Sequence, residues 1–164
     1  METFENNIAL LVVFICNHCH YVVHIRDSFV SFVSEYHEKG LGVVAISSND
    51  VESYPDDSPE QMTEDAVKYS YQFPYLFVES QEIAKAYRAA CTPDFFLYDR
   101  KRTLVYRGQY DSSRPNNSEH VKSEDFGNAT NVLIQNSNIP TEQKPSMGCN
   151  IKWKKGGEPD YFAT

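Results

Sequence analysis

Residues 8–20 read Ile-Ala-Leu-Leu-Val-Val-Phe-Ile-Cys-Asn-His-Cys-His, and this stretch decides the fold. The apolar residues 8–15 predict a strand buried on both faces, as in a parallel sheet covered by helices. From Tyr21 to Tyr36 apolar residues recur at steps of three and four, which predicts an amphipathic helix. Cys16 and Cys19 therefore lie where a strand ends and a helix begins. Backbone N–H groups and the positive end of the helix dipole favour a thiolate there.

The remaining sequence alternates strand and helix patterns. The predicted elements are a strand over 41–47, a polar loop over 48–58, a helix over 59–71, a strand over 75–78, a helix over 80–90, a β-hairpin of 94–99 and 103–107, and a weaker helix over 123–136. Ser58 and Ser80 are the predicted helix caps, with Pro59 at the first helical position. This order predicts a mixed α/β sheet that ends in an antiparallel hairpin.

Length and composition are those of one globular domain with a sizeable core. The chain has 164 residues, of which 41% are hydrophobic. We assign residues 1–139 to the domain and expect 140–164 to be a mostly irregular tail that packs on it or extends from it. The basic cluster from Lys152 to Lys155 is expected to be solvated.

Charge and hydropathy exclude two classes of partner. The formal net charge is −8, which opposes general binding of nucleic acid because phosphate recognition needs concentrated Lys and Arg. No segment has the roughly 20 apolar residues of a membrane span. Glu2 and Glu5 precede the apolar run where a signal peptide would be basic. We therefore expect a cytoplasmic protein without nucleic-acid or membrane partners, in which a Cys-x-x-Cys pair is more often catalytic or metal-binding than structural.

The strand, the Cys-x-x-Cys pair at a helix start and a later X-Pro before a β-hairpin together resemble the thioredoxin layout. The chain is most similar to the thioredoxin-like redoxin family, related to the alkyl hydroperoxide reductase and thiol-specific antioxidant group. The segments that carry the resemblance are residues 14–19, 46–57, 90–97, 106–109 and 143–153. It implies a three-layer α/β/α sandwich with a mixed sheet, and a thiol-based activity that needs no cofactor beyond a redox-active disulfide.

Three departures from the family pattern stand out. The chain starts almost at the central strand, so the N-terminal element of the family is expected to be shortened. His20 stands where the family has proline after the second cysteine. Peroxiredoxins carry a threonine three residues before the peroxidatic cysteine, and Val13 stands there.

The candidate catalytic residues are Cys16, Cys19 and Pro93. We expect Cys16 to be exposed at the helix tip as the nucleophile, and Cys19, one turn deeper, to resolve the mixed disulfide. Pro93 resembles the cis-proline that faces the dithiol in thioredoxin folds, where the preceding backbone can pair with an extended substrate.

Histidines near the dithiol are candidates for tuning it. A cationic His18 would stabilise a thiolate. His20 and His24 follow Cys16 at four-residue steps, so on a regular helix all three share a face. Each of these histidines can equally be a solvated surface group.

Cys91 and Cys149 have less definite roles. Cys91 lies two residues before Pro93, so it is a possible third redox thiol, and it could pair with Cys149 from the tail. The default for both is a small buried apolar residue.

The leading functional hypothesis is a thiol–disulfide oxidoreductase acting on protein or small-molecule thiols and disulfides, with thioredoxin or glutathione as possible partners. The first alternative is a thiol-dependent peroxidase. Two binding functions also remain: a c-type haem protein, since Cys16-x-x-Cys19-His20 matches the attachment motif, and a zinc module using the same three residues. A non-enzymatic scaffold or a defective paralogue is the last alternative.

Overall fold

The computed structural model describes residues 4–137, 139 and 141–162. Its elements are, in chain order, β1 (Ala9–Phe14), α1 (His20–His37), β2 (Leu41–Ser47), a short 3-10 helix (Pro55–Asp57), α2 (Pro59–Lys68), β3 (Tyr75–Phe77), α3 (Glu82–Tyr87), β4 (Cys91–Thr92), β5 (Asp94–Tyr98), β6 (Leu104–Gly108), α4 (Glu124–Ile134) and β7 (Cys149–Asn150).

The main sheet has five strands in the order β3-β2-β1-β5-β6. β1 is parallel to β2, and β2 is parallel to β3, whereas β5 and β6 join as antiparallel strands. β1 lies in the middle, and all six of its residues are buried, as the unbroken apolar run predicts. Because β1 and β2 are parallel neighbours, the loops after both strands lie at the same edge of the sheet.

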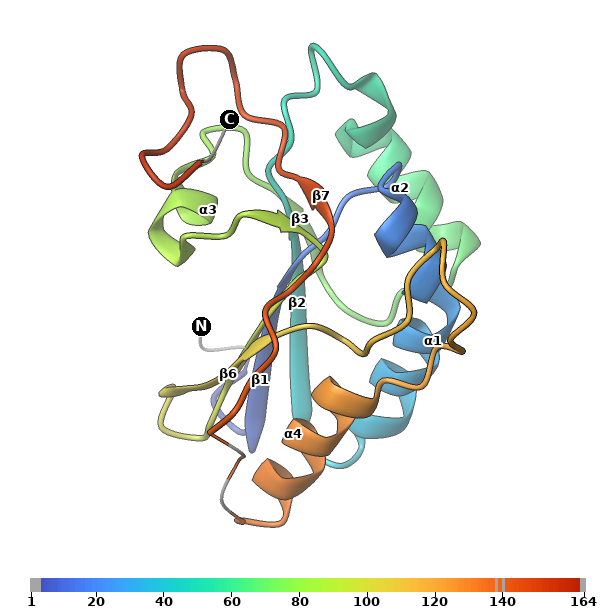
Figure 1. The fold of residues 1–164 in the computed structure, drawn as a ribbon, viewed down its shortest axis with the longest axis vertical. Coiled ribbons are helices and arrows are strands. Elements are labelled where there is room, and N and C mark those ends of the chain that lie inside the picture. The colour runs from blue at the N-terminus through green and yellow to red at the C-terminus, as the bar shows by residue number, and fades with distance from the viewer. Residues whose placement is uncertain (1–3, 138, 140, 163–164) are drawn as a thin grey trace.

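Helices cover the two faces of this sheet, which gives the predicted three layers. α1 and α4 lie on one side and α3 on the other (Figure 1). Alternate residues of β1 divide between the layers: Leu11 and Val13 belong to the core under α1 and α4. Leu10, Val12 and Phe14 belong to the core on the other face.

Two local predictions are wrong, and both corrections involve the tail. Ser80 does not cap α3, because Gln81 occupies the N-cap in a left-handed conformation with φ 61°. The buried Gln81 amide instead donates to the carbonyls of Ser48 and Lys152, at 2.6 and 2.9 Å, which ties α3 to the tail. The segment around Lys152 is not a solvated end either, since Trp153 is buried in the second core.

The tail also contains a strand that the sequence did not predict. β7 pairs with β4 in an antiparallel two-stranded sheet, with Thr92 opposite Cys149 and Cys91 opposite Asn150. β4 ends at the Thr92–Pro93 peptide bond, which is cis. The chain therefore returns from its far end to the corner that precedes β5.

In the part of the chain that the structure describes, no helix has the length and hydropathy needed to cross a membrane.

Gly148 is the residue that allows β7 to approach this corner. A Cβ atom built on Gly148 would lie 2.0 Å from the Thr92 carbonyl oxygen, which is backbone and cannot rotate away. We therefore expect Gly148→Ala to reduce the free energy of unfolding by about 1–3 kcal/mol, the usual cost of forcing an atom into a packed site. Urea unfolding would measure this loss, with Lys155→Ala, at an exposed position of the same tail, as the control. Equal stability of the two variants would contradict the close approach of β7.

Candidate active site

The two cysteines of the Cys-x-x-Cys pair lie in the loop between β1 and α1. α1 begins at His20, with Cys19 as its N-cap residue in an extended conformation. Cys16 therefore precedes the helix, and the prediction that Cys16, His20 and His24 share one helix face is wrong. Cys16 is also not exposed, since only 2% of its surface is accessible, and Cys19 is completely buried. The packing of the Thr92–Pro93 corner over this loop explains their burial.

Thr92 contacts both sulfur atoms. Its hydroxyl oxygen lies 3.4 Å from Cys16 Sγ, and its carbonyl oxygen accepts a hydrogen bond from the Cys19 thiol at 3.0 Å. The sequence prediction that Pro93 lies next to the dithiol thus has a physical basis in Thr92, the residue directly before it. The sequence pattern also predicted that the Thr92–Pro93 bond is cis and within contact distance of Cys16, as the structure has it, but it assigned no role to the Thr92 hydroxyl or carbonyl.

Asp57 is a second site residue that the sequence analysis did not find. Its carboxylate is fully buried. One oxygen accepts the backbone N–H groups of Asn17 and His18, at 2.8 and 3.3 Å. The other accepts from the Asn49 side chain at 2.7 Å and lies 2.7 Å from His18 Nδ1. Asp57 therefore fixes the main chain of the Cys16–Cys19 loop and the direction of the His18 ring.

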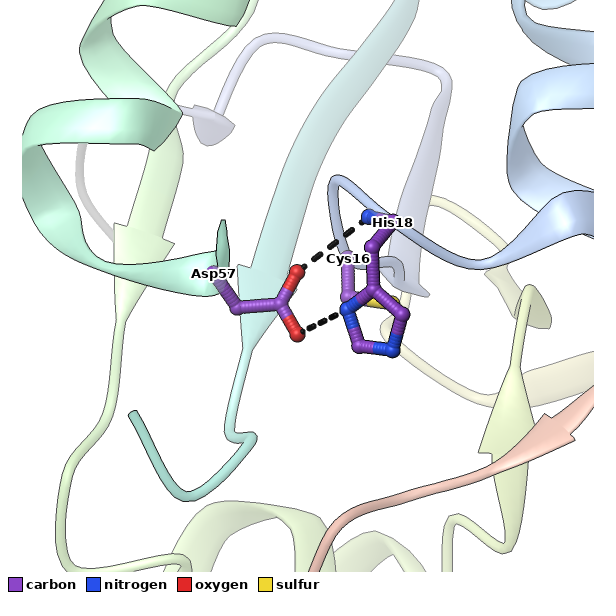
Figure 2. Close-up of side chains that lie close together, drawn as sticks. All are labelled: Cys16, His18 and Asp57. Atoms are coloured by element: carbon purple, nitrogen blue, oxygen red, sulfur yellow. Dashed lines mark hydrogen bonds and ion pairs between the residues drawn. The ribbon is translucent and has the colours of Figure 1, made fainter. Parts of the chain in front are cut away.

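Figure 2 shows this arrangement, with both Asp57 oxygens turned toward His18 and the Cys16 sulfur behind the imidazole ring. His18 also stacks on Tyr54, with ring centroids 5.7 Å apart and planes within 4°. Cys16, His18 and Asp57 each place a donor atom within 4.8 Å of the other two, so these residues could together hold a metal ion. This donor set differs from the predicted zinc set, in which Cys19 and His20 took part.

Asp57 follows β2 in the polar loop that looked like solvent-exposed chain. A signal for it did exist, because residues after neighbouring parallel strands meet at the same sheet edge. Arg26 strengthens the arrangement: its guanidinium donates to the Asn17 carbonyl at 2.8 Å and pairs with Asp65 at 3.1 Å. The Tyr75 hydroxyl donates to the Asn17 side chain at 3.0 Å. The loop is thus held from both α2 and β3.

The remaining predicted site residues lie around the same corner, apart from His20. The side chain of His20 is exposed, as expected of a solvated surface group. His24 lies 3.1 Å from the Ser113 hydroxyl and lines a small pocket together with Pro93. Cys91 is buried, with its thiol donating to the Pro93 carbonyl at 3.6 Å. Cys149 is half-buried and lies opposite Thr92, the residue that contacts both sulfurs of the pair.

The two thiols of the pair have opposite acidity. The hydrogen bond with Cys19, burial and the charge of Asp57 raise the pKa of Cys16 far above its usual range. The hydrogen bond from Cys16 lowers the pKa of Cys19 to about 4, against the effect of burial. The contact of Cys19 with the Thr92 carbonyl, in contrast, requires a proton on Cys19, because a carbonyl oxygen only accepts. The reduced pair therefore carries one negative charge at neutral pH and shares one proton between its sulfurs.

Comparison with known proteins identifies the family of the chain. The sequence profile of the AhpC/TSA family matches residues 1–107. The chain belongs to the AhpC/TSA family. Membership implies a thiol-based redox function. No curated protein sequence matches the chain.

Solved structures give the same fold at two levels of similarity. A hypothetical protein from Sinorhizobium meliloti 1021 is 48% identical, with a TM-score of 0.92 over 93% of this chain and 84% of that one. An uncharacterized conserved protein from Geobacillus kaustophilus is 49% identical, with a TM-score of 0.91 over 94% and 82%. A secreted disulfide oxidoreductase from Mycobacterium tuberculosis, 12% identical, has a TM-score of 0.56 over 82% and 85% and shares the fold alone. The predicted thioredoxin-like fold is confirmed.

The negative charge of Asp57 opposes ionisation of Cys16. We therefore expect Asp57→Asn, made in a Cys19→Ser background so that Cys16 is the only titrating thiol of the pair, to lower the pKa of Cys16. Thiolate absorbance against pH would then shift to lower pH. The matched control is Asp56→Asn, which removes an exposed carboxylate from the adjacent position. Coincident curves for the two variants would show that the Asp57 charge does not act on Cys16.

The same substitution has a cost in stability. The NH2 group of an asparagine at this position would face either the main-chain N–H groups or the Asn49 side-chain amide. Both are hydrogen-bond donors, so one donor would lose its acceptor. We expect Asp57→Asn to lose about 1–3 kcal/mol in the free energy of unfolding, as is usual for an unsatisfied buried polar group. Thermal or urea unfolding would measure it, and Asp56→Asn should stay close to the parent protein.

Proposed function

We propose that this protein is a thiol–disulfide oxidoreductase whose working group is the Cys16–Cys19 dithiol. The observation that supports this best is the convergence of both sulfurs on Thr92, at 3.4 and 3.0 Å. A carbonyl that holds the proton on Cys19 leaves the negative charge for Cys16, and the Thr92 hydroxyl can donate to that charge. Cys16 is then the attacking thiolate, and Cys19 stays in reserve as a thiol.

The reaction is two exchanges of sulfur partners. The Cys16 thiolate attacks one sulfur of a substrate disulfide, and the other substrate sulfur leaves as a thiolate. Cys19 then gives up its proton and attacks Cys16 Sγ, which releases the reduced substrate and leaves a Cys16–Cys19 disulfide. Its reduction by a thiol partner, such as glutathione or the dithiol of a thioredoxin, returns the protein to its starting state.

Burial of the dithiol limits which substrates can react. Only 2% of the Cys16 surface is accessible, so a protein disulfide can meet its sulfur only when the surrounding loop or tail opens locally. Small disulfides need less opening than folded proteins do. Substrates of the proposed enzyme are therefore small-molecule disulfides or disulfides in flexible segments.

Replacing the cysteines one at a time tests the proposal. We expect Cys16→Ser to reduce insulin disulfides no faster than the uncatalysed background, because the nucleophile is absent. Cys19→Ser should instead accumulate mixed disulfides through Cys16, because nothing resolves them. Insulin turbidity and non-reducing mass spectrometry would measure the two effects, with Cys91→Ser as a cysteine control outside the pair. Trapping by Cys16→Ser but not by Cys19→Ser would reverse the two roles.

One observation favours a thiol-dependent peroxidase as the second candidate. The Thr92 hydroxyl next to Cys16 Sγ could hydrogen-bond a peroxide oxygen, which offsets the absence of a threonine at Val13. Cys16 would then be oxidised to a sulfenic acid as the peroxide is reduced to an alcohol or water. Attack by Cys19 would form the disulfide and release water. Peroxide consumption that exceeds the rate of insulin reduction would favour this candidate.

A further inference from the structure

Cys149 stands where a substrate is expected to bind. In the layout that the chain resembles, the backbone before the cis-proline pairs with an extended substrate. Here β7 of the same chain occupies that place, with Cys149 directly opposite Thr92. Gly148 lets β7 come this close, because any larger residue would collide with the Thr92 carbonyl. The chain thus brings its own cysteine to its own dithiol.

The surroundings of Cys149 connect it to Cys19. Cys149 pairs across the two strands with Thr92, whose carbonyl accepts a hydrogen bond from the Cys19 thiol at 3.0 Å. Burial and the neighbouring Cys19 thiol both raise the pKa of Cys149. The backbone N–H of His20, the first residue of α1, lowers the pKa of Cys149. Cys91, the other cysteine outside the pair, donates its proton to the Pro93 carbonyl instead.

Cys149 is also the only cysteine of the four that is not buried. Cys16 and Cys19 have almost no accessible surface, so an external thiol reaches a disulfide between them with difficulty. A disulfide that includes Cys149 would offer one sulfur at the surface. The structure therefore holds a buried dithiol and, on the strand next to Thr92, a third thiol that is partly open to solvent.

We propose that Cys149 takes the disulfide from Cys16–Cys19 and presents it, as a Cys19–Cys149 bond, to external reductants. In this step the Cys149 thiolate attacks Cys19 Sγ, the Cys19–Cys149 bond forms, and the Cys16–Cys19 bond breaks to leave a Cys16 thiolate. The number of disulfides is unchanged, and the proton of Cys149 passes to solvent. A reducing thiol, such as glutathione, then attacks Cys149 Sγ, releases Cys19 as a thiolate and forms a Cys149–glutathione disulfide. A second glutathione attacks this mixed disulfide, which frees the Cys149 thiolate and yields oxidised glutathione. This relay rests on the proposed oxidoreductase function.

The acidity of the three thiols favours the second step of this relay and opposes the first, because Cys149 must lose its proton to attack and Cys16 is a poor leaving group. Burial raises the pKa of Cys149 to about 11, whereas the His20 N–H and Lys152 lower it. When an external thiol attacks Cys149, Cys19 leaves as a thiolate, and the hydrogen bond from a protonated Cys16, which lowers the pKa of Cys19 to about 4, stabilises that thiolate. Attack at Cys149 is therefore favoured both by access and by the leaving group.

Two double variants with equal cysteine counts test the relay. Cys16→Ser/Cys91→Ser retains Cys19 and Cys149, and should form an intramolecular disulfide in a buffer of oxidised glutathione. Cys16→Ser/Cys149→Ser retains Cys19 and Cys91, and should form glutathione adducts only. Peptide mapping without reduction distinguishes the products, and circular dichroism establishes that both variants are folded. A missing Cys19–Cys149 bond in the first variant, or equal cross-linking in both, would overturn the relay.

The wild-type protein provides a measurement that does not depend on the variants folding. Partly oxidised protein, quenched with acid and mapped, should contain both Cys16–Cys19 and Cys19–Cys149 bonds. Cys149→Ser should lose the second bond and be reduced more slowly by glutathione, whereas Cys91→Ser should match the wild type. A wild-type map with no Cys19–Cys149 bond contradicts the proposal.

The insulin assay separates the two proposals. Insulin reduction without a Cys19–Cys149 bond would refute the relay and leave the oxidoreductase function standing. A Cys19–Cys149 bond in a protein that does not reduce insulin would refute the oxidoreductase function and leave the contact between these two cysteines standing.

Discussion

Thr92 is the residue on which the arrangement of the site depends. It is buried and lies in β4, where its carbonyl accepts from Cys19, its hydroxyl meets Cys16, and its backbone pairs with β7. The cis peptide bond to Pro93 follows immediately. One residue thus places three thiols around a single peptide group. A change in the path of the chain here would separate the dithiol from the tail and alter both its acidity and its exposure.

Asp57 opposes the charge that the dithiol must carry. A fully buried carboxylate near Cys16 makes the thiolate there harder to form. The main-chain and Asn49 hydrogen bonds to Asp57 compensate for its own burial and hold the loop in one conformation. The same group therefore supplies rigidity and an unfavourable charge. The reduced pair carries a single negative charge. Asp57 therefore affects how this charge is divided between the sulfurs of Cys16 and Cys19.

Much of the fold could be predicted from local patterns. The apolar run before Cys16 and the stripe from Tyr21 to Tyr36 predicted a buried strand and a helix, and the structure has β1 and α1 there. β2 spans Leu41–Ser47 as predicted, and the Ser58 hydroxyl accepts from the Gln61 backbone as a cap should. These features depend on neighbours in sequence, which periodicity and capping patterns report directly.

The features that sequence reasoning missed depend on contacts between distant segments. Asp57 belongs to a polar stretch, and no local pattern distinguishes it from the exposed Asp56 beside it. β7 has only two residues, and it exists because Thr92 offers a partner far away in the chain. The prediction of an exposed Cys16 failed for the same reason, since its cover comes from other segments. The sequence prediction of an acidic Cys16 relied on the helix terminus alone. It omitted burial and the Asp57 carboxylate, which both raise the pKa of Cys16.

The site combines protection with a route to solvent, and these two properties have different structural origins. Protection comes from the loop before α1, which Asp57 and Arg26 hold under the Thr92–Pro93 corner. The route comes from the tail, where Cys149 remains half-buried beside a completely buried Cys19. A dithiol closed on all sides would exchange with partners only through local unfolding. A tail strand with one partly accessible thiol instead allows exchange at the surface while β1, α1 and the corner stay in place.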